Sequence, residues 1–178
     1  MLRIVIVLLS FGVSVQAMAQ GMNADWVAKW ANARDYTLAV ADAMSDSLYD
    51  FRPDYPAGVD GERPARTFGE QLVHLGGNVA WLSTSKLVDG ERPSSADVDA
   101  SDKAAVRAYL IDVFAHAEQV LAKLSFGDLD EEVPWFTGET ISRRRVGLLL
   151  FDHVTHHRGQ ALVYLRLNGV FAPKYVGW

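Results

Sequence analysis

The sequence predicts an all-α fold, a four-helix bundle formed by one domain. Four long segments carry apolar residues at helical spacing, and the alternation typical of strands is hard to find. The chain has 178 residues, of which 49% are hydrophobic and 22% charged, which is ordinary for a soluble globular domain. Amphipathic helices of this length favour a bundle around one core.

The first two helices are separated by a long break. Apolar residues keep helical spacing from about residue 24 to 49, and a Pro/Gly-rich connection follows over residues 52–66. The next helix is expected to open at Thr67, which forms a capping-box pattern with Glu70, and to end near Gly90. The pair Gly76–Gly77 lowers helix propensity in its middle, which indicates the close approach of another helix or a ligand.

The last two helices are bounded by clear stop signals. One is expected from Ser101 to Leu124, followed by a loop over residues 128–138. The other is expected to begin near Thr140 or Ser142 and to reach Asn168, with Gly169 as its C-terminal cap.

Residues 1–19 predict a secretory signal peptide. Arg3 gives a positive start, an apolar run covers residues 4–15, and small residues precede position 20. The mature domain is therefore expected to be 20–178, periplasmic or secreted and without a stable membrane span. Two alternatives stay open: a retained N-terminal anchor, or a true start at Met22, which would make the protein cytoplasmic.

Composition limits the chemistry that the chain can perform. There is no cysteine, which excludes thiolate metal ligands and a cysteine nucleophile. The net charge of -5 gives no basic surplus for nucleic acid or anionic lipid. The only basic run, residues 143–145, is interpreted as a solvated helix face or an anion contact.

Histidine spacing indicates a metal site. His153 and His157 are four residues apart, so a helix places both imidazoles on one face, where they can share a divalent metal with a third ligand. His74 is the candidate for that ligand, because Gln71 and Asn78 share its helix face and bundles build metal sites from facing helices. The alternative for His74 is a core histidine held by hydrogen bonds.

The remaining polar residues receive simpler interpretations. His156 is expected either at the surface, paired with Asp152, or in contact with the metal ligands without binding the metal; the alternative is that it replaces His157. His116 is expected to be exposed. Arg158 is interpreted as a surface arginine, with a substrate anion as the alternative. No general base stands out. Candidate acceptors for the second ring nitrogens of the imidazoles are Asp152, Gln71 and Asn78.

The final helix resembles a known family. His153-x3-His157-Arg158-Gly159-Gln160, continued by residues 164–170, together with a histidine in the second helix, resembles the DinB/YfiT-like superfamily of damage-inducible, metal-binding bundles. The resemblance covers most of the mature chain in helix order and is specific over residues 153–170. It implies an up-down-down-up topology, a homodimer and a divalent transition metal (Zn, Ni or Fe) held by His74, His153 and His157.

Characterised relatives of that family include thiol-dependent S-transferases. The expected function is therefore that of a metal-dependent enzyme, a hydrolase or a thiol-type S-transferase, acting on a small-molecule substrate. The alternative is a non-catalytic metal-binding or stress-response protein, and a third reading leaves the histidines without metal. Export argues against thiol transfer, because the thiols that those relatives use are cytosolic.

Overall fold

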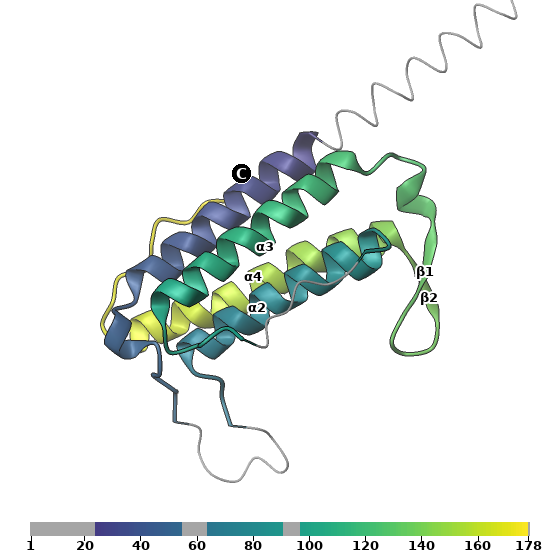
Figure 1. Cartoon of the computed structure of the whole chain (residues 1–178). Coiled ribbons are helices and arrows are strands. Elements are labelled where there is room, and N and C mark those ends of the chain that lie inside the picture. The colour runs from purple at the N-terminus through teal and green to yellow at the C-terminus, as the bar shows by residue number, and fades with distance from the viewer. Residues whose placement is uncertain (1–23, 55–63, 91–96, 178) are drawn as a thin grey trace, which may run out of the picture.

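The computed structural model describes residues 24–54, 64–90 and 97–177, which form a mostly helical bundle (Figure 1). Within the described residues four long helices run along one another, and a small hairpin lies at one end of the bundle. The prediction of a bundle of four helices is confirmed. The elements are a first helix over residues 24–43, η1 (Asp46–Leu48), α2 (Phe68–Leu82), a π-helical turn η2 (Ser83–Leu87), α3 (Lys103–Lys123), η3 (Asp128–Asp130), β1 (Glu132–Pro134), β2 (Thr140–Ser142) and α4 (Arg143–Leu167).

Local capping fixes where α2 begins. The Thr67 side chain accepts a hydrogen bond from the Glu70 amide at 3.1 Å, and the Glu70 carboxylate accepts one from the Thr67 amide at 2.7 Å. This reciprocal pair satisfies two amides that have no partner within the helix. The predicted capping box is confirmed, and it sets the start of the helix that carries His74.

The ends of α4 also follow the predicted signals. The Ser142 side chain caps the first turn by accepting from the Arg145 amide. At the other end Gly169 has a φ of +70°, and the Val170 amide bonds the Leu165 carbonyl at 2.9 Å. This bond pattern closes a helix where only glycine enters the left-handed region without strain.

Close helix contacts hold the bundle together. A Cβ added at Gly76 would lie 2.7 Å from the Tyr109 ring, so α2 and α3 approach each other at this glycine. The approach confirms the predicted reason for a glycine in mid-helix. On the other side of the core, the buried Trp30 indole donates to the Phe114 carbonyl at 2.9 Å and joins the first helix to α3.

Two expectations about boundaries were wrong. The first helix ends at residue 43, with a short 3-10 turn before residue 49. The predicted loop after α3 contains half of an antiparallel hairpin, in which Val133 pairs with Ile141 and both side chains are buried. Strands of three residues are too short to show a period-2 pattern, and Pro134 argues against a strand on sequence grounds.

The predicted signal peptide lies outside the described residues and stays a prediction. Among the helices that the structure does describe, none combines the length and the apolar character needed to cross a membrane.

Candidate metal centre

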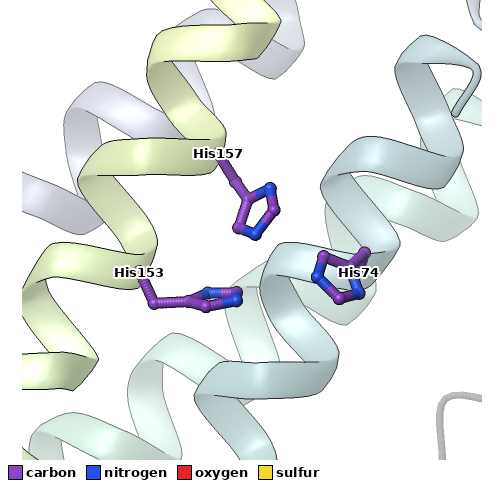
Figure 2. A group of neighbouring side chains, drawn as sticks. All are labelled: His74, His153 and His157. Atoms are coloured by element: carbon purple, nitrogen blue, oxygen red, sulfur yellow. The ribbon is translucent and has the colours of Figure 1, made fainter. Parts of the chain in front are cut away.

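Three imidazoles from two helices face one another in the interior of the bundle. His74 comes from α2, and His153 and His157 come from successive turns of α4 (Figure 2). One ring nitrogen from each residue can be chosen so that all three lie within 4.8 Å of one another. The ring centroids are 4.2 Å apart for His153 and His157, and 4.5 Å apart for His74 and His157.

Burial keeps these imidazoles neutral. His157 is only 7% exposed, whereas His74 and His153 are half-buried. Desolvation, followed by the neighbouring imidazoles, lowers the pKa of His157 to about 3 and that of His153 to about 4. Burial and the charge of Arg66 also lower the pKa of His74. At neutral pH all three rings therefore carry a free lone pair, which is the form that binds metal.

One ring nitrogen at this site is buried without a partner. Nδ1 of His153 is inaccessible to solvent and accepts or donates no hydrogen bond among the described residues. Such a group ordinarily costs about 1–3 kcal/mol, so native proteins rarely keep one without a reason. An imidazole with an unsatisfied ring nitrogen is a poor core residue, which favours a functional role for His153 over a purely structural one.

Three side-chain amides contact the rings, and the two expected as acceptors, Gln71 and Asn78, present their amide nitrogens instead. The Gln71 amide nitrogen lies 2.6 Å from Nδ1 of His157, and the Gln160 side-chain oxygen lies 3.2 Å from the same atom. Asn78 contacts His74 Nε2 at 3.4 Å and donates to its carbonyl at 3.2 Å. The third predicted acceptor, Asp152, is exposed, and no hydrogen bond joins it to the three rings within residues 24–54, 64–90 and 97–177.

The other histidines lie outside the group. His156 is exposed and contacts Gln160 at 3.1 Å, so the structure brings His157 and not His156 to the other two rings. The expectation that His116 is exposed was wrong. It is half-buried and hydrogen-bonded to the Thr84 hydroxyl at 3.1 Å, because the π-helical turn after α2 places Thr84 against α3.

Arg158 is not the surface residue that was expected. It is 6% exposed and donates to the Ala33 carbonyl and the Thr37 hydroxyl of the first helix, at 3.2 and 3.4 Å. One position along a helix turns a side chain by about 100°, so Arg158 leaves α4 on a different face from His157. It therefore belongs to the opposite interface of α4.

A cavity of about 340 Å³ opens beside His74. Glu70 and Asn78 supply its polar wall, and Val73 and Val98 supply an apolar one. This volume is within the range of small-molecule sites. Sequence reasoning did not identify Val98, because this residue precedes α3 and reaches the cavity only through the packing of α2 against α3.

Comparison with known proteins agrees with this architecture. A family model described as the DinB superfamily matches residues 29–161. A DinB-like protein from Bacillus cereus is 19% identical, with a TM-score of 0.65 over 85% of this chain and 95% of that one. A DinB-like protein from Bacillus subtilis is 17% identical, with a TM-score of 0.63 over 85% and 96% of the two chains. At these identities the two structures show a shared fold. No curated protein matches this chain.

Proposed function

Since this chain belongs to the DinB superfamily, we propose that it binds one divalent transition-metal ion through His74, His153 and His157 and uses it as a metal-dependent hydrolase. The observation that carries the proposal is that ring nitrogens of three buried or half-buried, neutral imidazoles lie within 4.8 Å of one another.

The donor set fits such an ion. Nitrogens at 2.0–2.1 Å from a tetrahedral zinc are roughly 3.3 Å apart. The three candidate atoms lie within 4.8 Å of one another, so each pair must close by at most about 1.5 Å. We expect side-chain rotation to close this distance. Nickel and iron accept the same ligands.

Three histidine ligands leave a coordination position for water or substrate, which is the arrangement of catalytic zinc sites. Because imidazole is neutral, the ion would keep its full charge and, when bound, would lower the pKa of a coordinated water toward neutrality. The role of this chain is then to position a substrate in the 340 Å³ cavity beside His74, with Asn78 as a hydrogen-bonding group on its wall.

We also propose the up-down-down-up order of the four helices. Contacts of α2 and the following turn η2 with α3 advance in the same direction along the chain, from Gly76 with Tyr109 to Thr84 with His116. Because α2 and α3 follow each other in sequence and run parallel, a crossover must connect them, as the up-down-down-up order requires. Figure 1 shows α4 running antiparallel to both α2 and α3.

An exported, homodimeric mature domain completes the proposal. The sequence pattern of residues 1–19 supports export, and the homodimer is proposed by analogy with the DinB superfamily. N-terminal sequencing of the protein from its native host, and its mass in solution by light scattering, test these two points separately.

Elemental analysis of the purified protein tests the metal site. We expect one transition-metal ion per chain in the wild type, its loss in His153→Ala, and full retention in His156→Ala, a matched change at an exposed histidine three residues along the same helix. Metal-dependent hydrolysis of an ester and amide panel, lost in His153→Ala, would support the enzyme. Stoichiometric metal without turnover would instead favour the non-catalytic metal-binding protein.

A further inference from the structure

A buried arginine lies on a different face of α4 from His153 and His157, against the first helix. Arg158 is 6% exposed, and no acidic side chain pairs with it in the part of the chain that the structure describes. Buried guanidinium groups are almost always paired, because removing a charge from water is costly. Arg158 therefore lacks the counter-charge that its position calls for.

Only part of its hydrogen-bonding capacity is used. Nη1 donates to the Ala33 carbonyl and the Thr37 hydroxyl, and the guanidinium carbon lies 4.7 Å from the centre of the Tyr36 ring. The ring stabilises the charge but accepts no conventional hydrogen bond. Of the five N–H donors of a guanidinium, those on Nε and Nη2 have no acceptor among the described residues.

A cavity adjoins this side chain. It has a volume of about 160 Å³, and its walls include Arg158, Lys29, Phe151, Thr155 and Tyr175. Among the described residues of this lining there is no acidic side chain. A protein cavity of about 150 Å³ accommodates a benzene ring, so there is room for a small organic molecule.

We propose that this cavity, between the first helix, α4 and the C-terminal segment, binds a small organic carboxylate. The carboxylate oxygens take the unused N–H donors of Arg158, for which a planar fork is the matching geometry. The apolar body of the ligand lies against Phe151 and Tyr175, which favours an organic acid over inorganic phosphate. The site is separate from the metal centre, and the proposal does not depend on the proposed function.

Benzoate is the probe, and benzamide, which has the same shape without the charge, is its control. Calorimetry on the full chain is expected to show benzoate binding and at least tenfold weaker binding of benzamide. Arg158→Met should raise the Kd for benzoate about 10- to 100-fold, the loss expected for charged hydrogen bonds. Arg166→Met, which removes an exposed arginine from the same helix, should leave the Kd unchanged.

A second variant keeps the test valid if the buried substitution Arg158→Met prevents the protein from folding. Thr155 is exposed and lines the cavity, so Thr155→Trp should fill it, without disturbing the contacts of Arg158, and abolish binding. The absence of benzoate binding to the wild type, equal binding of benzamide, or retained binding in Thr155→Trp would each overturn the proposal.

A chain lengthened by a few glycine and serine residues after residue 178 separates two sources of carboxylate. Equal affinity of the two chains for benzoate supports an external ligand. Binding by the lengthened chain alone would assign the cavity to the chain's own terminal carboxylate, and it would overturn the proposal of an external ligand.

Discussion

Replacing His153 with leucine is expected to stabilise the metal-free protein while destroying the metal site. Nδ1 of His153 is buried without a partner, and desolvation is the main reason that its pKa falls to about 4. Leucine is of similar size and has no polar atom, so the variant removes an unsatisfied group without leaving a large void. A site built for metal should show this conflict between stability and function.

The size of the gain follows from the cost of the unsatisfied nitrogen. A buried polar group without a partner costs about 1–3 kcal/mol. Because the rest of the His153 ring is only half-buried, we expect the lower part of this range, about 1–2 kcal/mol. In a domain of this length that free energy corresponds to a rise in Tm of about 2–8 °C.

Metal should reverse the order of stability. Free metal at 100 times its Kd adds about 2.7 kcal/mol to a protein that binds it only when folded. Wild type gains this stabilisation, and His153→Leu does not. The assay is urea unfolding at pH 7.5, first in chelator and then with excess zinc. His156→Leu is the matched control at an exposed site and should change the free energy of unfolding by less than about 0.5 kcal/mol. If metal-free His153→Leu is less stable than metal-free wild type by more than about 1 kcal/mol, the imidazole has a structural role and the reasoning fails.

Three further predictions concern the same bundle. Gly159 is exposed within α4, and an added Cβ meets nothing within 4 Å, so Gly159→Ala should raise the free energy of unfolding by about 1 kcal/mol in a urea melt; a decrease would mean that another surface packs there. Gly76→Ala should lower it by about 1–3 kcal/mol, because the new Cβ would lie 2.7 Å from the Tyr109 ring, and an unchanged midpoint would refute this close approach. The pKa values of His153 and His157 in the folded protein, about 4 and about 3, are below the unfolded value of 6.5, so the unfolded chain binds more protons between these limits. The metal-free protein should therefore lose stability as the pH falls from about 6.5 toward 3, and urea midpoints that do not change over this interval would contradict the burial of these rings.

The sequence predicted the part of the site that lies on one helix. His153 and His157 needed only the helical period, which is a local property. His74 was also predicted, but from the polar helix face that it shares with Gln71 and Asn78 and from the family resemblance, because residue spacing does not say which helices face each other. The burial of Arg158 depends on the Ala33 carbonyl, 125 positions away in the chain, so its surface interpretation was wrong for the same reason.

The fold shows the same division between local and distant causes. The capping box at Thr67 and the glycine at position 169 act within a few residues and were predicted correctly. The hairpin that pairs Val133 with Ile141 is stabilised by the burial of both side chains. Its strands are too short for this burial to be predicted from the sequence. His116 is held by Thr84, 32 positions earlier, and no periodicity links them.

X-ray absorption spectroscopy of the zinc-loaded protein is the most direct test of the central claim. The account predicts three imidazole nitrogens at about 2.0–2.1 Å from the metal, with one or two oxygen ligands. It also predicts a reduced imidazole count, or loss of the metal, in His74→Ala. Two or fewer imidazoles in the wild type, or an unchanged spectrum in His74→Ala, would contradict a site formed by His74, His153 and His157.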